Sequence, residues 1–279
     1  MGTLYVVATP IGNLEDITAR ALRVLGEVTL IAAEDTRRTG TLLSHFNLAP
    51  DRLTSYFEHN KLTKLAKVLA HLETGDAALV SDGGTPNLSD PGYELVRAAL
   101  AAGHAVVAVP GASALLTALV ASGLPTDAFV YLGFLPRQEA ERRQLLASVA
   151  RERRTLVAYE APHRLLDSLA TLEATLGDRP AAVARELTKR HEEIFRGPVS
   201  AARAHFAAKE ILGEITLVIG GAPAEAAEKW DSGRVQAEVA ELVAGGLRRK
   251  DAARIVADLS GWLRRDVYRL AVDAGSAAE

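Results

Sequence analysis

The run Ala77-Ala78-Leu79-Val80-Ser81-Asp82-Gly83-Gly84-Thr85-Pro86 joins a short apolar segment to a loop rich in Gly and Pro. Such a pattern is typical of a buried parallel strand whose carboxyl end opens into a turn. This alternation of apolar runs and amphipathic stretches predicts a mostly parallel sheet with helices on both faces. The further strands are expected at 4–8, 28–32, 53–56 and 105–109, and the helices at 17–25, 62–72 and 93–101.

A second α/β set is expected after a break at 122–126, where Gly and Pro interrupt the apolar pattern. The segments at 181–185 and 193–196 are too close for a helical crossover, so part of this second sheet is expected to be antiparallel. We therefore expect two α/β/α domains with mostly parallel sheets, over residues 1–121 and 122–222. The second set has expected strands at 129–132, 155–159, 181–185, 193–196 and 214–219, with helices at 139–149, 163–172 and 200–207.

Residues 223–279 have a different composition and are expected to form a linker followed by a helix-turn-helix-like extension of three helices, at 235–243, 249–257 and 264–271. Between Arg234 and Arg269 basic residues outnumber acidic ones by eight to five, whereas the whole chain has a net charge of -3. A basic helical unit on an acidic body is compatible with a nucleic acid as partner. Charge alone favours the alternative, a solvated helical hairpin with Arg-rich faces.

Composition excludes several classes of protein. The chain of 279 residues contains no Cys, which excludes disulfides, thiolate metal sites and a cysteine nucleophile. Its start has no basic segment before an apolar run, and no apolar stretch reaches the roughly 20 residues of a membrane helix. The seven His residues show no spacing typical of a metal site. We expect a soluble, cytoplasmic protein that needs neither a membrane nor a metal.

Three loops with Gly or Pro follow expected strands, at 9–13, 81–86 and 110–114. Ligands of open α/β sheets bind outside the carboxyl ends of the strands, so three such loops together favour a ligand site. The alternative is that they are plain turns in which Asp16, Asp90 and Ser113 cap the following helices. No G-x-G-x-x-G follows the first strand and no G-x-x-x-x-G-K-[ST] occurs, which argues against a nicotinamide-binding domain and a P-loop.

Charged residues also gather near expected strand ends. A carboxylate beside a cation there can orient a hydroxyl group or accept its proton. Ordinary helix caps and surface ion pairs are the alternative for each of them. The candidates for proton transfer are Glu34, Asp35, Glu160, Glu186 and Lys189.

Together these motifs resemble a known family. The run 4–18 resembles the opening of the bacterial ribosomal RNA small subunit methyltransferase I family, whose members are 16S rRNA (cytidine 2′-O)-methyltransferases of the tetrapyrrole methylase superfamily. The resemblance is strongest over Ser81–Gly92 and spans residues 3 to 222. It continues through Ala33–Arg37, Pro110–Ala114, Gly133–Arg137, Tyr159–Arg164 and Arg185–Lys189, and the basic tail resembles an extension that these enzymes often carry.

The resemblance implies a methyltransferase that binds S-adenosylmethionine in the cleft between two α/β domains, usually as a homodimer. Residues of both domains correspond to cofactor-binding positions of the superfamily. In the first domain they are Pro10, Ile11, Asp82, Thr85, Ser113 and Ala114, and in the second they are Tyr159, Ala184 and Ile215.

The implied reaction is methylation of a cytidine ribose 2′-hydroxyl in the decoding region of 16S rRNA, presented as free rRNA or as a small ribosomal subunit. The RNA contacts that we expect, mostly to phosphates, come from Arg37, Arg38, Arg137, Arg142, Arg143, Arg164, Arg248, Arg249 and Lys250. A methyltransferase acting on a small tetrapyrrole and a non-catalytic nucleic-acid-binding regulator are the alternatives. The basic tail argues against the first, and the cofactor-type loops argue against the second.

Overall fold

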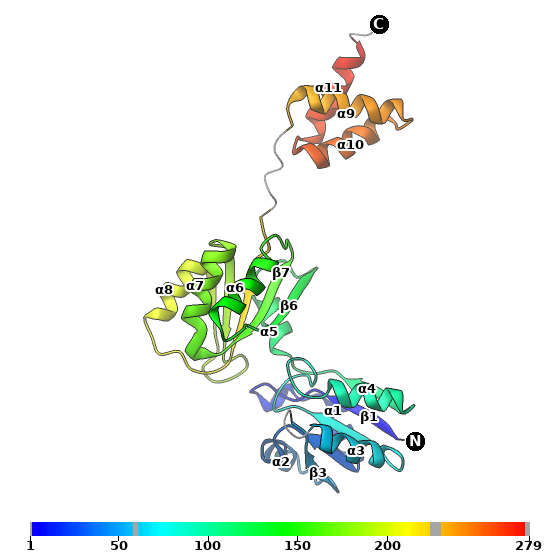
Figure 1. Cartoon of the computed structure of the whole chain (residues 1–279), viewed down its shortest axis with the longest axis vertical. Coiled ribbons are helices and arrows are strands. Elements are labelled where there is room, and N and C mark those ends of the chain that lie inside the picture. The colour runs from blue at the N-terminus through cyan, green and yellow to red at the C-terminus, as the bar shows by residue number, and fades with distance from the viewer. Residues whose placement is uncertain (1, 58–60, 224–229, 277–279) are drawn as a thin grey trace. The chain divides into compact units, whose positions relative to one another are not determined.

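The computed structural model describes residues 2–57, 61–223 and 230–276. Most of the predicted linker, 224–229, lies outside the described residues. The chain divides into two compact units, Met1–Gly221 and Ala222–Glu279, and each is described by itself (Figure 1).

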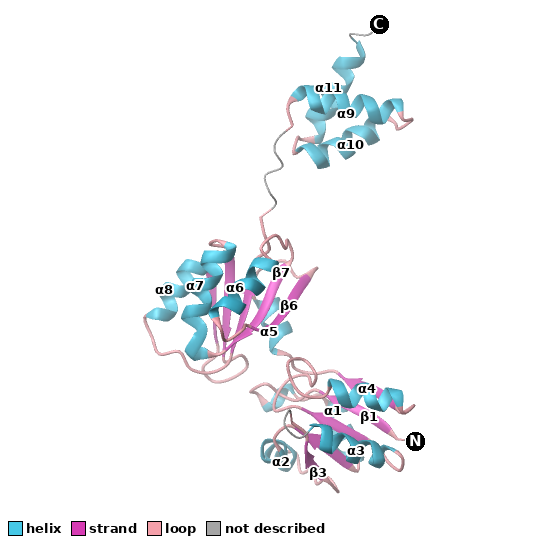
Figure 2. Ribbon diagram, in the orientation of Figure 1, coloured by secondary structure: helices cyan, strands magenta, loops and turns pink. Residues whose placement is uncertain are grey.

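Unit 1 contains two sheets, drawn in magenta in Figure 2. The first has five strands in the order β3-β2-β4-β1-β5. Every neighbouring pair in it is parallel, as the continuous apolar runs predicted. Parallel pairing directs the carboxyl ends of all five strands to one edge of the sheet, so the loops that follow them gather there. The strands are β1 (Thr3–Val7), β2 (Leu30–Ala33), β3 (Leu53–Ser55), β4 (Ala77–Val80) and β5 (Ala105–Val109).

Helices cover both faces of this first sheet. On one face α1 (Ala19–Glu27) and α2 (Thr36–His45) pack against a buried cluster that includes Val7 and Val80. On the other face α3 (Lys61–Leu72) and α4 (Tyr93–Ala101) pack against a cluster that includes Leu79. Val80 and Leu79 are neighbours in β4, so the two faces follow from the alternation of side chains along a strand.

The second sheet has the order β6-β7-β10-β8-β9. Only β6 and β7 pair in parallel; the other three pairs are antiparallel. The α/β fold class is confirmed, but this sheet is more antiparallel than expected. A short link, 186–192, reverses the chain between β8 and β9, and the helix after β9 then carries it back across β8 to β10. The strands are β6 (Phe129–Phe134), β7 (Thr155–Glu160), β8 (Pro180–Arg185), β9 (Glu193–Pro198) and β10 (Ile215–Ile219).

One helix links the two halves of unit 1, which are the parts built on the first and on the second sheet. Helix α5 (Ala114–Ala121) follows β5 in sequence but packs on the second sheet, with Leu115 and Leu119 against Val157 and Val218. The opposite face of that sheet is covered by α6 (Glu139–Ser148), α7 (Leu165–Leu176) and α8 (Val199–Ala207). The domain boundaries expected at residues 121 and 222 stay predictions.

Unit 2 is a bundle of three helices, drawn in orange to red in Figure 1. They are α9 (Ser232–Ala244), α10 (Arg249–Ser260) and α11 (Arg264–Ser276). Their core includes Val235, Val256 and Val267. Trp262 Nε1 donates a hydrogen bond of 2.7 Å to the carbonyl oxygen of Trp230, which ties the start of α9 to the turn before α11.

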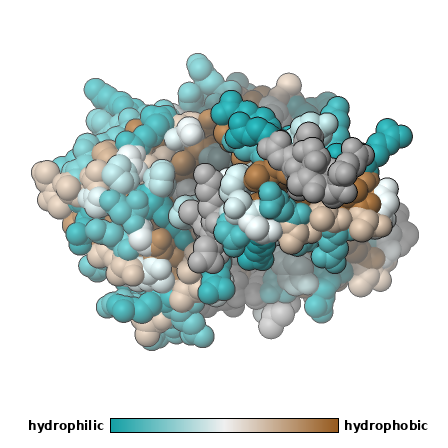
Figure 3. All heavy atoms as spheres, turned by 90° about the horizontal axis from the view of Figure 1, so that it is seen from above, coloured by the Kyte–Doolittle hydropathy of each residue, from teal (hydrophilic) through white to brown (hydrophobic). Residues whose placement is uncertain are grey.

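Hydrophilic residues cover most of the face shown in Figure 3, and apolar residues form smaller patches on it. Among the described residues, no helix combines the length and the apolar character needed to cross a bilayer.

Candidate active site

A cavity of about 730 Å³ lies in unit 1, where the carboxyl ends of β1 and β4 face β7 and β10. All three predicted loops contribute to its wall, through residues 9–12, 81–85 and 113–114. The second half contributes Tyr159, Leu187 and Ile215, among others. The volume falls in the range of small-molecule sites, about 300–1,000 Å³.

The three proposed helix caps do not form in the structure. Helix α1 is capped by Thr18, whose hydroxyl accepts from the Ala21 N–H at 3.0 Å, and not by Asp16. Helix α4 begins after Gly92 without a side-chain cap, so Asp90 does not cap it. Ser113 precedes α5, but its side chain makes no capping hydrogen bond. Asp90 and Ser113 line the cavity instead.

The first two loops are joined by their backbones. The N–H of Thr9 donates to the Gly84 carbonyl and the N–H of Gly84 donates to the Thr9 carbonyl, both at 2.9 Å. Gly84 has a φ of +85°, which favours glycine, and a Cβ atom on Gly83 would lie only 3.1 Å from the Pro10 carbonyl oxygen. These glycines therefore allow the two loops to form one continuous part of the wall.

Leu187 and Lys189 line the opposite wall, and their segment, 186–189, touches the first loop directly. The N–H of Asn13 donates to Thr188 Oγ1 at 3.1 Å, and a Cβ atom on Gly12 would lie 2.3 Å from Lys189 Cγ. Glu186 and Thr188 have φ values of 51° and 67°, in the left-handed region. Non-glycine residues pay a strain energy there of about 1–3 kcal/mol each, and such residues cluster at functional sites.

Lys189 is held in this wall by two carboxylates. Its Nζ lies 2.8 Å from Glu186 Oε1 and 3.2 Å from Glu214 Oε2. Burial alone would lower the pKa of Lys189, but the two carboxylates raise it above its ordinary value. Burial alone would raise the pKa of Glu186, but hydrogen bonds from Lys189 and from the Glu214 N–H lower it. Lys189 is therefore a fixed cation at neutral pH.

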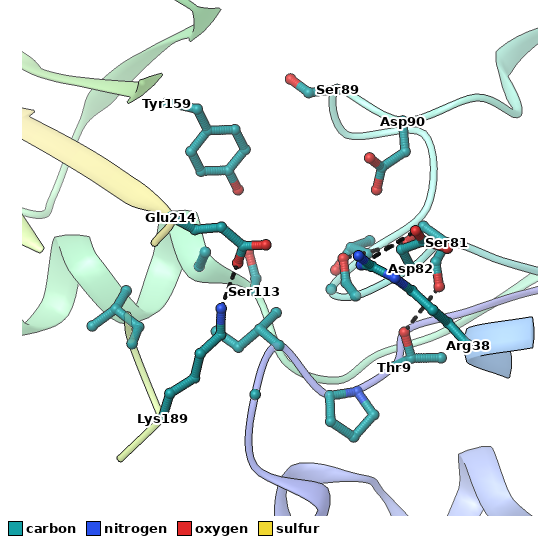
Figure 4. Close-up of a pocket in the computed structure, with 18 of the residues that line it drawn as sticks. Thr9, Arg38, Ser81, Asp82, Ser89, Asp90, Ser113, Tyr159, Lys189 and Glu214 are labelled. Atoms are coloured by element: carbon teal, nitrogen blue, oxygen red, sulfur yellow. Dashed lines mark hydrogen bonds and ion pairs between the residues drawn. The ribbon is translucent and has the colours of Figure 1, made fainter. Parts of the chain in front are cut away.

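A second charged pair, Asp82 with Arg38, lines the cavity on the side of the first sheet (Figure 4). The Asp82 carboxylate accepts from the Asp35 N–H at 2.9 Å and pairs with Arg38 at 3.4 Å. The N–H of Asp82 donates in turn to Glu34 Oε2 at 3.2 Å. Burial raises the pKa of Glu34, although the hydrogen bond from Asp82 opposes the shift.

Two of the proton-transfer candidates lie outside the cavity wall. Asp35 caps α2, and its carboxylate accepts from the backbone N–H of Arg37 at 2.8 Å and pairs with the Arg37 guanidinium at 2.7 Å. These bonds lower the pKa of Asp35 to about 2. Glu186 is also outside the wall and anchors Lys189. Ala184, a predicted cofactor contact, does not line the cavity either, because it is buried in the core beneath α5.

Glu160 lines the cavity but is fully engaged. Its Oε1 accepts from the Ala161 N–H and pairs with Arg164, both at 2.6 Å, while Ser168 donates to Oε2. The Glu160 side chain has no exposed surface. Its geometry is that of a buried ion pair that ties the end of β7 to the start of α7.

Two side chains in the wall, Asp90 and Phe134, were not candidates in the sequence analysis. Asp90 lies across the cavity from Tyr159 (Figure 4). Burial raises the pKa of Asp90 to about 6, with further contributions from Glu34 and other carboxylates. Phe134 is half-exposed, and its ring centroid lies 5.3 Å from that of Tyr159. The resemblance over Gly133–Arg137 was a signal that includes Phe134, whereas Asp90 was named only as a helix cap in the alternative interpretation of the loops.

The predicted RNA-contacting arginines separate into two groups. Arg142, predicted to contact a phosphate, is buried and donates to Thr171 and to the Pro136 carbonyl. Arg164 is almost enclosed beside Glu160. The others are exposed: Arg37, Arg38, Arg137 and Arg143 in unit 1, and Arg248, Arg249 and Lys250 in unit 2.

Comparison with known proteins places the chain in a family. Residues 3–203 match the sequence pattern of the Tetrapyrrole (Corrin/Porphyrin) Methylases. A "Ribosomal RNA small subunit methyltransferase I" of Synechocystis sp. is 48% identical over 98% of both chains. The chain belongs to this methylase family, and within it to the ribosomal RNA small subunit methyltransferase I proteins. The family resemblance is thereby confirmed.

Two further relatives add detail. The Thermotoga maritima protein of the same name is 49% identical and matches over 99% of its own length but only 79% of this chain. The fold is shared with a uroporphyrin-III C-methyltransferase of Thermus thermophilus, solved with S-adenosylhomocysteine, at a TM-score of 0.55 and 20% identity, over 79% of this chain and 97% of that one. Membership in the family confirms the expected class, a methyltransferase that uses S-adenosylmethionine.

The cavity of this methyltransferase fits that cofactor electrostatically. S-adenosylmethionine carries a sulfonium and an ammonium group against one carboxylate. Five carboxylates line the cavity, and only two permanent cations do so. The carboxylates belong to Glu34, Asp82, Asp90, Glu160 and Glu214, and the cations to Arg38 and Lys189. Among the described residues, no three His, Cys, Asp or Glu side chains form a group that could hold a metal ion.

We expect Arg164→Met to destabilise the protein by about 3 kcal/mol, because it leaves the Glu160 carboxylate buried without its cation. Urea unfolding at pH 8 measures the change. The double variant Glu160→Gln with Arg164→Met removes both charges and should recover most of the loss. Equal instability of the single and double variants would contradict this account of the pair.

Proposed function

We propose that this chain transfers the methyl group of S-adenosylmethionine to the ribose 2′-hydroxyl of a cytidine in the decoding region of 16S rRNA. The observation that carries the proposal is the 48% identity over 98% of both chains with a ribosomal RNA small subunit methyltransferase I. The substrate is free 16S rRNA or the small ribosomal subunit, which places the enzyme in the cytoplasm. The specific nucleotide and the 2′-oxygen come from the family resemblance.

In this proposal the two halves of unit 1 hold the cofactor between them. Pro10, Ile11, Asp82, Thr85, Ser113 and Ala114 contact it from the first half, and Tyr159 and Ile215 from the second, since all eight line the cavity. The cofactor supplies a methyl group already activated by the positive sulfur. The residues therefore contribute mainly position, with the acceptor oxygen in line behind the methyl–sulfur bond.

The acidic cavity also restricts how RNA approaches. Phosphates are repelled by a wall in which carboxylates outnumber cations, so a single unpaired nucleotide enters with its sugar and base while the backbone stays at the rim. The exposed Arg37, Arg137 and Arg143 bind phosphates outside the cavity. Phe134, 55% exposed in the wall, offers a ring face on which the base can stack.

Unit 2 is the second proposed RNA contact. Arg248, Arg249 and Lys250 are exposed at the start of α10, where the positive end of the helix dipole makes cations unfavourable by a few tenths of a kcal/mol each. A bound phosphate relieves this cost. The Thermotoga maritima relative is shorter than this chain by about the length of unit 2, which supports a role of this unit in substrate binding rather than in chemistry.

The family resemblance also implies a homodimer, and a stripe on α5 supports it. Leu116 and Val120 lie one helical turn apart and are 51% and 72% exposed. The adjoining element in sequence, β5, is an edge strand of the first sheet. Exposed apolar side chains on neighbouring turns of a helix are a common basis for contact between protein chains.

We expect incubation with methyl-labelled S-adenosylmethionine and small ribosomal subunits lacking this modification to label one cytidine ribose of 16S rRNA. Mapping of the labelled nucleotide measures the outcome, and matched free 16S rRNA shows which form is the substrate. Cofactor binding without transfer to either RNA would contradict the proposal. Transfer to a tetrapyrrole instead would assign the chain to the small-molecule alternative.

We expect Arg248→Glu with Arg249→Glu to weaken binding of the small subunit at least tenfold at 0.1 M salt and to leave cofactor affinity unchanged. Filter binding and calorimetry measure the two affinities. The control is Arg52→Glu with Arg97→Glu, which makes the same change in net charge at exposed positions of unit 1. Equal weakening by both pairs would reduce the effect to overall charge and contradict a specific role of α10.

We expect the native enzyme to sediment with the mass of two chains and Leu116→Glu with Val120→Glu to sediment as one chain. Sedimentation velocity at micromolar concentration measures the mass. A native protein that sediments as a single chain would contradict the homodimer, and a double variant that remains dimeric would move the interface away from α5.

A further inference from the structure

The segment 87–92 contains three residues with a positive φ. Asn87 and Ser89 have φ values of 73° and 66°, in the left-handed region that non-glycine residues rarely adopt. Gly92 has a φ of 146°, and a Cβ atom there would lie 1.9 Å from Asn87 Oδ1. Non-glycine residues persist in such conformations only where the surrounding structure imposes them, often at functional sites.

A contact between the two halves holds this segment in place. The Ser89 hydroxyl and the Tyr131 hydroxyl, from β6 of the second half, lie 2.6 Å apart. The Tyr131 ring packs against Tyr159, with the ring centroids 5.4 Å apart. The side chain of Asp90, the next residue along the chain, is therefore positioned between the two halves and lines the cavity.

Asp90 also lies where the cavity adjoins a second hollow. That hollow is lined by Glu34, Phe57, Ser89, Asp90 and Pro91, and three of these also line the cavity. A reaction between a cofactor and a separate acceptor needs such a junction, because the two reacting atoms meet there. Asp90 is therefore placed where a cofactor in the cavity and an acceptor in the hollow would come together.

The other acidic candidates are occupied. Glu160 accepts from three donors, and Asp35 and Glu186 lie outside the wall. Asp82 pairs with Arg38, and Glu214 with Lys189. Among the described residues Asp90 has no ion pair, and its one hydrogen-bonding partner is the Ser81 hydroxyl. Glu34 accepts from the Asp82 N–H, and the charge of Arg38 acts on it.

The surroundings of Asp90 tune it for proton transfer. Burial, together with the carboxylates of Glu34, Asp82 and Glu214, raises the pKa of Asp90 to about 6, while the hydrogen bond from Ser81 opposes the shift. Tyr131 and Tyr159 face it from the second half. A carboxylate with this pKa is charged at pH 8 and is a better proton acceptor than an ordinary surface aspartate.

We propose that Asp90 is the catalytic base that accepts the proton of the acceptor hydroxyl, a role that rests on the proposed function. The hydroxyl oxygen forms the new C–O bond with the methyl carbon, the C–S bond breaks, and its electron pair stays on sulfur. The hydroxyl proton passes to a carboxylate oxygen of Asp90. Ser81 orients that carboxylate, and the Ser89–Tyr131 contact keeps it at the junction.

The test compares the native enzyme with Asp90→Asn and Asp90→Glu in single-turnover transfer of labelled methyl to unmodified small subunits, between pH 5 and 9. We expect Asp90→Asn to slow transfer at pH 8 by about 100-fold or more, with cofactor affinity within twofold of the native value. The native rate should fall about tenfold per pH unit below pH 6, and this dependence should be lost in Asp90→Asn. Asp90→Glu should keep the pH dependence at a lower rate.

Thermal unfolding separates a catalytic role from a structural one. Because the folded-state pKa of Asp90, about 6, lies above its ordinary value of 3.8, its charge costs stability, in full above pH 6. That cost is lost progressively as the pH falls from 6 to 3.8. Asp90→Asn removes the cost and should therefore raise the unfolding midpoint at pH 8 while it abolishes activity. A structural role predicts a lower midpoint.

The control is Asp127→Asn, at an exposed loop position before β6, which should change neither rate nor stability. An Asp90→Asn rate within threefold of native, or a loss of rate matched by loss of cofactor affinity, would overturn the role of Asp90 while transfer by the native enzyme upholds the proposed function. A native enzyme that does not methylate the subunits would overturn both.

Discussion

The contact between residues 9–13 and residues 186–189 sets the distance between the two sheets, and the cavity depends on that distance. Gly12 leaves room for the Lys189 stem, where a Cβ atom would lie 2.3 Å from Lys189 Cγ. The Asn13 N–H donates to Thr188, whose own backbone is in the left-handed region. Strand ends from two sheets are thus brought face to face. The first sheet contributes the loops that follow β1 and β4, and the second contributes strand residues such as Tyr159 and Ile215. The hydrophobic core of each sheet packs on its own helices, so the contact between the two loops interrupts neither core.

Acidic and basic residues are separated between this cavity and the surface around it. Carboxylates gather inside, where Arg38 and Lys189 are each tied to an acidic partner. Such a cavity attracts a cationic cofactor and repels phosphate. The exposed guanidinium groups that lie outside it are free to bind phosphates. An enzyme of net charge -3 can therefore act on a polyanion if its basic groups are placed outside the reaction cavity and on a separate helical unit.

The rule that the loops of a parallel sheet gather at the carboxyl ends of its strands predicted the three loops of the first half correctly. The search for apolar periodicity missed α2, whose buried side chains are only Thr39 and Leu43, too few for a clear period. The burial of Arg142 depends on Thr171, a partner 29 residues away, and no local pattern reveals it. Asp90 was named as a cap in the alternative interpretation because Asp often precedes helices, whereas α4 begins after Gly92 without a side-chain cap.

The position of Asp90 illustrates why active sites are poorly read from local propensity. Propensity describes which conformation a residue prefers, but Ser89 is held in the left-handed region, which serine disfavours. The energy that stabilises this conformation comes from elsewhere, from the Ser89–Tyr131 contact and from β4 and α4 on either side. The same constraint that defeats prediction gives the carboxylate a fixed place among other acids, and a carboxylate with a fixed place there has a raised pKa and the properties of a proton acceptor.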